Sequence, residues 1–89
     1  MSTIPLAKLA KGAVAHIHSI VPNEAFGDLD PVVTRRLADL GFSDGVALMV
    51  IATGIFGKGP YAVRLGNQSQ FAVREPEAAK ILCRVEGAK

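Results

Sequence analysis

The sequence predicts a mainly β fold, a small barrel of about five short strands with one helix inserted between the first strand and the second. Three observations lead to this prediction. Glycine and proline residues divide the 89-residue chain into short segments. In several of these segments, large apolar residues recur at every second position, which is typical of strands. One segment, residues 30–40, instead repeats its apolar residues with the longer period of a helix.

The amino-terminal part of the chain predicts a single turn, a strand and a loop. Leu6 and Leu9 lie three residues apart before Gly12, which indicates one helical or 3₁₀ turn that packs two leucines on the core. Residues 13–20 are rich in β-branched side chains and predict the first strand, with a bulge because the apolar residues are spaced by three. Residues 21–29 are expected to form a long mobile loop.

The helix is expected to begin at Asp30. Its carboxylate can accept the free amide hydrogens of the first turn as an N-cap, and Pro31 follows where a missing N–H has no cost. An apolar stripe, which packs on the core, consists of Val33, Leu37 and Leu40.

The end of the helix is marked by Gly41, which can adopt the left-handed conformation of a C-cap. Phe42 then lies where it can contact Leu37, as is common in this kind of cap. Gly45 follows in a turn that leads into the next strand.

The second half of the chain predicts four more strands, at residues 46–53, 61–65, 68–74 and 81–86, with a helical turn opened by Pro76 before the last. Residues 46–53 are apolar on both faces, with Leu48 and Val50 on one and Met49 and Ile51 on the other. One face of a sheet in a small domain normally meets water. We therefore expect the helix to cover Met49 and Ile51, with a homodimer through this strand as the alternative.

Five strands joined mostly by hairpins, with one helix, fit an SH3-like barrel made by a single domain over residues 1–89. A domain of this size buries only about 60–65% of its unfolded surface, which leaves little room for a deep enzyme cleft. The formal net charge is +2 and the basic residues are scattered, so the charge does not predict binding to nucleic acid or to an anionic membrane.

The single cysteine, Cys83, excludes an internal disulfide and favours a reducing compartment, so we expect a cytoplasmic protein with this thiol in the core. The longest uncharged apolar run, residues 46–56, is shorter than the ~20 residues of a membrane-spanning helix. We therefore expect neither export nor membrane insertion.

Residues 36–45 carry a distinctive order of residues. Arg36 and Leu37 precede Leu40-Gly41-Phe42, and Gly45 follows. With the leucines before Gly12 and the later Gly59-Pro60, this order resembles the FeoA proteins and FeoA-like domains of bacterial ferrous iron uptake, over residues 6–85. The resemblance implies an SH3-like accessory protein, without catalytic residues, that acts in the cytoplasm on FeoB. FeoB is a membrane transporter that imports ferrous iron and carries a guanine-nucleotide-binding domain.

Two groups of residues are candidates for contact with such a partner. Ile55, Phe56 and Lys58 lie at a glycine-flanked tip that a small core does not necessarily reach, although such residues can also fold back. Arg35 and Arg36 are either solvated charges of the helix or contacts to an acidic surface.

A second hypothesis is a metal-binding or metal-sensing protein. His16 and His18 leave one face of a strand and, with Glu24, Asp28 or Asp30, could hold a divalent ion such as iron or zinc. The alternative is a structural role for both histidines. A third hypothesis, an SH3-type binder of proline-rich peptides, is disfavoured because the chain has one tyrosine and no tryptophan.

Overall fold

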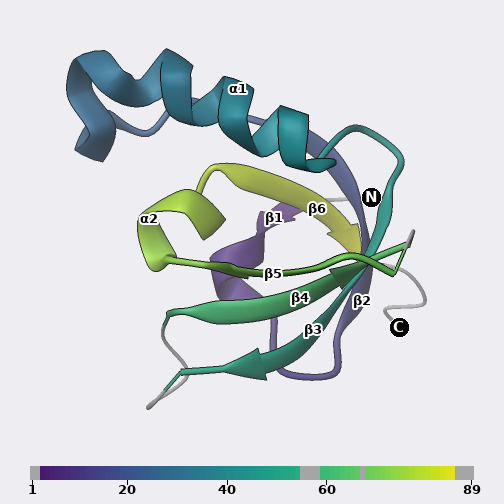
Figure 1. Cartoon of the computed structure of the whole chain (residues 1–89). Helices are drawn as coiled ribbons and strands as arrows, with labels where there is room; N and C mark the ends of the chain where they lie inside the picture. The colour runs from purple at the N-terminus through teal and green to yellow at the C-terminus, as the bar shows by residue number, and fades with distance from the viewer. Residues whose placement is uncertain (1–2, 55–58, 67, 86–89) are drawn as a thin grey trace.

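A single curled antiparallel sheet forms the body of the molecule in this computed structural model, which describes residues 3–54, 59–66 and 68–85 (Figure 1). The strand order is β1-β6-β2-β3-β4-β5. The strands are β1 (Thr3–Pro5), β2 (Val14–Ile20), β3 (Ala47–Thr53), β4 (Tyr61–Leu65), β5 (Gln70–Val73) and β6 (Ile81–Val85). The helical elements are η1 (Leu6–Lys8), η2 (Glu24–Leu29), α1 (Asp30–Leu40) and α2 (Glu75–Ala78). The predicted mainly β fold is confirmed.

The sequence analysis missed β1, so the long helix lies between the second strand and the third, not between the first and the second. β1 has three residues and ends in Pro5, which leaves it without an alternating pattern. It is a strand because it pairs with β6 near the other end of the sequence, with Ile4 opposite Cys83. Such distant pairing has no local signal.

The core lies inside the curled sheet, as the alternation in the strands predicts. Leu6 and Leu9 of the first turn are buried, and the expected bulge in β2 falls between Ile17 and Ser19. The buried side chains from the strands are Ala15, Ile17, Leu48, Val50, Tyr61, Val63, Leu65, Val73, Ile81 and Cys83.

Helix α1 ends as predicted. Gly41 has φ 113°, and the amide of Phe42 donates to the carbonyl oxygen of Leu37 at 3.1 Å. These bonds bring Phe42 into the core, where it and Leu37 are both buried. The prediction that Leu40 packs on the core is wrong, because this last residue of α1 is 40% exposed. Gly45 also has positive φ, 87°, in the turn before β3.

Helix α1 begins at Asp30, as predicted, but Asp30 is not its N-cap. Residues 24–29 are not an irregular loop but form η2, whose cap Asn23 accepts a hydrogen bond from the amide of Ala25 at 2.9 Å. Leu29 therefore enters α1 already in a helical conformation, and Asp30 is the first helical residue rather than the N-cap. The Asp30 carboxylate instead accepts from the Asn23 amide at 2.9 Å and from Nζ of Lys80.

The prediction that α1 covers Met49 is also wrong. Helix α1 lies on the opposite side of the barrel from β3 (Figure 1). Met49 remains 39% exposed, beside Val14 at 43% exposed on the neighbouring strand, while Ile51 is half-buried. No helix in the described part of the chain is both long and apolar enough to cross a membrane.

Candidate protein-binding groove

A groove runs between α1 and the edge strand β5, with η2 and α2 at one end. Its wider part is a hollow of about 460 Å³ lined by Phe26, Arg36, Ala72, Arg74, Pro76 and Glu77. A narrower hollow of about 90 Å³ shares three of these residues and is otherwise lined by Val33, Leu37, Leu40, Phe71 and Val73. We call the two together the α1–β5 groove. Its lining combines apolar side chains with guanidinium groups.

The wide end of the groove is held in place by a buried lysine. Lys80, which directly precedes β6, is fully buried and pairs with the carboxylate of Asp30. Its Nζ also lies 5.6 Å from the centroid of the Phe26 ring, a cation–π distance. The side-chain amide of Asn23 donates to the carbonyl oxygen of Pro76 at 3.0 Å. These contacts fix η2 against α2 and place Phe26 in the groove.

The environment of the Asp30 carboxyl favours its charged form. The hydrogen bond from Lys80, followed by that from the Asn23 amide, lowers the pKa of Asp30 below its ordinary value. The Asp30 carboxylate therefore stays ionised at neutral pH.

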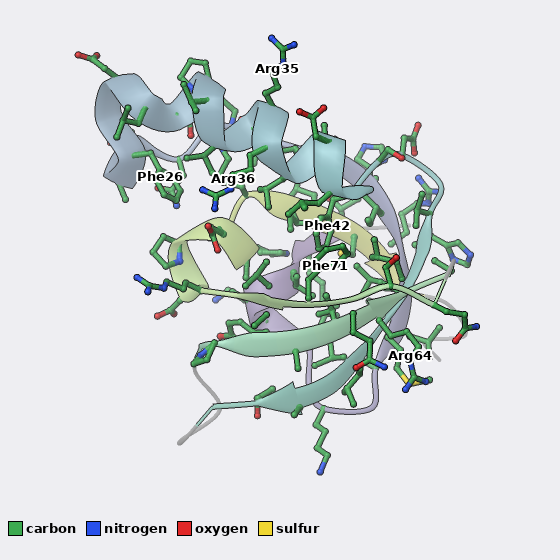
Figure 2. All side chains as sticks on the ribbon, viewed as in Figure 1. Phe26, Arg35, Arg36, Phe42, Arg64 and Phe71 are labelled. Carbon is green, nitrogen blue, oxygen red and sulfur yellow. The ribbon has the colours of Figure 1, made fainter. Side chains whose placement is uncertain are left out.

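Two phenylalanines support the narrow end of the groove from below. The rings of Phe42 and Phe71 lie 5.6 Å apart between centroids and are tilted by 51°, a favourable aromatic arrangement (Figure 2). Phe42 is fully buried, whereas Phe71 is partly exposed and lines the groove. The narrow end of the groove thus rests on the hydrophobic core.

The two adjacent arginines of α1 point in different directions. Arg35 extends away from the sheet, whereas Arg36 extends toward α2 and β5 and lines the groove (Figure 2). Arg74 adds a second guanidinium, and no carboxylate of the described residues lies within 4 Å of either groove arginine. The nearby Glu77 carboxylate accepts from the backbone amide of Arg74 at 3.0 Å. The groove is therefore a cationic and apolar surface.

A family model, the FeoA domain, matches residues 4–85 of this chain. The chain belongs to the FeoA domain family. This match spans all the described elements except the first residue of β1, and it confirms the resemblance identified from residues 36–45.

Solved structures of similar proteins share the fold of this FeoA domain. The FeoA of Stenotrophomonas maltophilia is 29% identical, with a TM-score of 0.75 over 90% of this chain and 88% of that one. It was solved in complex with zinc, and it is described as an unusual prokaryotic SH3 domain protein, which agrees with the predicted SH3-like barrel. The FeoA of Chlorobium tepidum is 27% identical, with a TM-score of 0.77 over 97% of this chain and 73% of that one.

A FeoA-like protein of Clostridium acetobutylicum has a TM-score of 0.79 at 24% identity, over 100% of this chain and 93% of that one. At this identity the likeness supports the fold alone. The comparison with curated proteins found no match.

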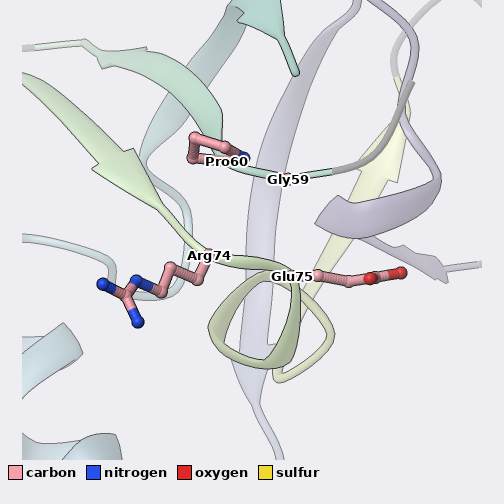
Figure 3. A pocket seen from close by; sticks show the side chains of 4 residues that line it. All are labelled: Gly59, Pro60, Arg74 and Glu75. Atoms are coloured by element: carbon pink, nitrogen blue, oxygen red, sulfur yellow. The ribbon is translucent and has the colours of Figure 1, made fainter. Parts of the chain in front are cut away.

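A separate hollow of this FeoA domain, outside the α1–β5 groove and of about 420 Å³, is lined by Gly59, Pro60, Arg74 and Glu75 (Figure 3). The side chains of Arg74 and Glu75 point in opposite directions. Catalysis by a charged pair requires groups that converge on one reacting atom, and these two do not. The predicted contact residues Ile55, Phe56 and Lys58 precede this hollow in sequence and lie outside the described residues.

The two histidines of the metal hypothesis lie beside an arginine. Arg84 is opposite His16 in the β2–β6 register, and its Nη1 lies 3.1 Å from Nδ1 of His18. The Asp44 carboxylate lies 3.8 Å from the same guanidinium nitrogen. Across the described residues, no group of three or more histidine, cysteine or acidic side chains is placed to hold a metal ion.

Cys83 lies in the core, as predicted. Its side chain is fully buried, and its Sγ lies 3.8 Å from the carbonyl oxygen of Ile81. Burial raises the pKa of the Cys83 thiol to about 11, so the thiolate is scarce at neutral pH. This cysteine is a structural residue rather than a metal ligand or nucleophile.

Sequence reasoning identified Arg36 but missed Phe26, Arg74 and Glu77 as parts of one surface. Phe26 comes from η2, Arg74 from between β5 and α2, and Glu77 from α2, and η2 meets the other two segments only in the folded chain. The one local signal was Pro76, which marked the start of a helical turn but not what that turn faces.

Proposed function

We propose that this chain is a non-enzymatic accessory protein of bacterial ferrous iron uptake that binds the cytoplasmic part of a FeoB-type transporter. The observation that carries the proposal is membership of the FeoA domain family over residues 4–85. The similar S. maltophilia protein, at 29% identity, is proposed to be an activating factor of bacterial ferrous iron transport.

The α1–β5 groove supports a binding role. It joins apolar side chains to two guanidinium groups, and arginine and aromatic residues are enriched where proteins bind one another. The exposed residues near it include Leu40, at 40% exposure. A partner that covers this surface removes apolar area from water and pairs the cations with its own acidic groups.

Binding to purified FeoB tests the proposal. The chain is immobilised and exposed to detergent-solubilised FeoB of the same organism and, separately, to its isolated cytoplasmic domain, each with and without guanine nucleotide. We expect retention of both, and dependence on nucleotide indicates action on the transport cycle. No retention in any state contradicts the proposal.

Two sets of variants locate the contact. The double variant Ile55→Ser, Phe56→Ser tests the predicted tip, and Arg36→Ser tests the groove, with Arg35→Ser as a control of equal charge. A loss confined to the tip variant assigns the interface to residues 55–58. Unchanged affinity of the tip variant removes that segment from the interface.

Divalent metal binding is a second candidate, favoured by the zinc complex of the S. maltophilia relative. In this chain it would use His16 and His18, and binding requires the Arg84 guanidinium to move away from His18. Calorimetric titration of Zn²⁺ or Fe²⁺ against the wild type and the double variant His16→Ala, His18→Ala measures this directly. If the double variant still gives a heat of metal binding, the metal is bound by other residues.

A further inference from the structure

The edge of β5 carries backbone groups that the sheet does not use. Among the described strands, β5 has only β4 as a neighbour. The Leu65 amide donates to the carbonyl oxygen of Ser69 at 2.8 Å, which makes this opposed pair a hydrogen-bonded one. Bonded and non-bonded pairs alternate in an antiparallel ladder. Gln70 and Ala72 are therefore at non-bonded positions, and each directs its amide and carbonyl away from β4.

This edge opens onto the α1–β5 groove. Ala72 lines both hollows, and its small exposed side chain does not obstruct them. Proteins usually protect an edge strand by keeping it short, or with lysine, proline, a bulge or a covering segment. The β5 segment, Gln70–Val73, is short, but it contains neither lysine nor proline, and its register with β4 is regular. The edge is thus suited to pair with another strand.

The walls of the groove indicate what that strand carries. Val33, Leu40 and Phe71 offer apolar contact on one side of the edge. Arg36 and Arg74 offer two guanidinium groups, against the single carboxylate of Glu77, which already accepts from a backbone amide. Arginine pairs with carboxylates through two parallel hydrogen bonds. The charge of the groove therefore favours an acidic segment.

We propose that the groove binds an extended acidic segment of the partner, which adds as a strand to the edge of β5. Its backbone pairs with Gln70 and Ala72, an apolar side chain packs against Leu40 and Phe71, and a carboxylate pairs with Arg36 or Arg74. The identity of the partner rests on the proposed function, whereas the open edge is a property of this chain alone.

Amide hydrogen exchange of the free protein tests the edge without any partner. The amides of Phe71 and Val73 are expected to be protected by β4, whereas the Ala72 amide is expected to exchange freely. Addition of the FeoB cytoplasmic domain at saturation then slows exchange at Ala72 by at least about tenfold. Protection of Ala72 in the free protein, or no slowing in the complex, overturns the proposal.

Affinity measurements on variants test the pairing and the charge separately. Ala72→Pro removes an outward amide but no bond to β4, so we expect a folded protein that binds about tenfold or more weakly. Arg36→Ser is expected to weaken binding at least about fivefold, and Arg35→Ser by less than about twofold. A thermal melt of each variant confirms that it is folded.

The outcomes distinguish the two proposals. If the wild type binds FeoB and both Ala72→Pro and Arg36→Ser bind equally well, strand addition is wrong and the proposed function stands. If the wild type does not bind FeoB in any nucleotide state, the proposed function fails, and strand addition to FeoB fails with it. If Arg36→Ser and Arg35→Ser weaken binding equally, general charge attraction replaces the groove as the explanation.

Discussion

Gly59 lies so close to the start of α2 that a single added methyl group should lower the stability of the whole domain. A Cβ at this position would lie 2.7 Å from the backbone nitrogen of Glu75, and ordinary contact begins at 3.4 Å. The two segments must therefore separate by about 0.7 Å, the difference between these distances. A backbone nitrogen cannot rotate away as a side chain can, so the start of α2 has to move.

We expect Gly59→Ala to lower the free energy of unfolding by about 1–3 kcal/mol, the usual cost of overpacking. For a domain of this size, each kcal/mol corresponds to about 4–8 °C in melting temperature. Thermal unfolding followed by circular dichroism should therefore show a decrease of about 4 °C or more.

Gly66→Ala is the matched control. A Cβ there meets its nearest atom, the carbonyl oxygen of Ala47, at 3.7 Å, which is ordinary contact. Both variants reduce the freedom of the unfolded chain in the same way, so the difference between their melting temperatures isolates the contact. If Gly59→Ala melts within about 2 °C of Gly66→Ala, the close approach to α2 does not constrain the fold.

Three further predictions follow from single groups. Because burial raises the pKa of the Cys83 thiol to about 11, a thiol reagent at pH 8 should react slowly with the folded protein and fully in denaturant; rapid reaction of the folded protein contradicts this burial. The Tyr61 hydroxyl donates to the carbonyl oxygen of Ala7 at 3.1 Å, so Tyr61→Phe should cost about 0.5–1.5 kcal/mol in urea unfolding, with an unchanged m-value. The pKa of Asp30 is lower in the folded protein than in the unfolded chain, where it is about 4. The contribution of Asp30 to stability is therefore fully present above the pKa of the unfolded chain, and it is lost as the pH falls through the pKa of the folded protein. Asp30→Asn should therefore show a flatter decline in unfolding free energy below about pH 4 than the wild type.

The parts of the fold that the sequence predicted are those with a local physical cause. Gly41 and Phe42 end the helix as expected because the left-handed residue and the hydrogen bond from Phe42 to Leu37, five residues earlier, are both local to the end of the helix. The alternation that buries Cys83 is likewise a property of its own strand. By contrast, β1 exists only because β6 pairs with it. Asp30 is not the N-cap because η2 runs directly into α1, and its carboxylate pairs instead with Lys80, which is distant in sequence.

The candidate site was predictable to the same extent. Adjacent helical residues are about 100° apart around the axis, so at most one of Arg35 and Arg36 could face a given neighbour. The sequence could not decide which, because the apolar stripe fixes the buried face but not which strand edge lies beside it. In the structure it is Arg36 that faces the groove, because β5 and α2 lie on its side of the helix.

The Lys80–Asp30 pair links the stability of the domain to the shape of its groove. Removing the carboxylate of Asp30 leaves the buried Lys80 without its opposite charge. Lys80 also holds Phe26 at the wide end of the groove. We therefore expect Asp30→Asn to weaken partner binding at pH 7, even at temperatures far below its melting point. Binding by Asp30→Asn and the wild type can be compared by the retention assay, with Asp39→Asn as a control of equal charge on the same helix. Equal loss in both variants would assign the effect to net charge, whereas loss in Asp30→Asn alone would show that the anchoring of η2 determines the binding surface.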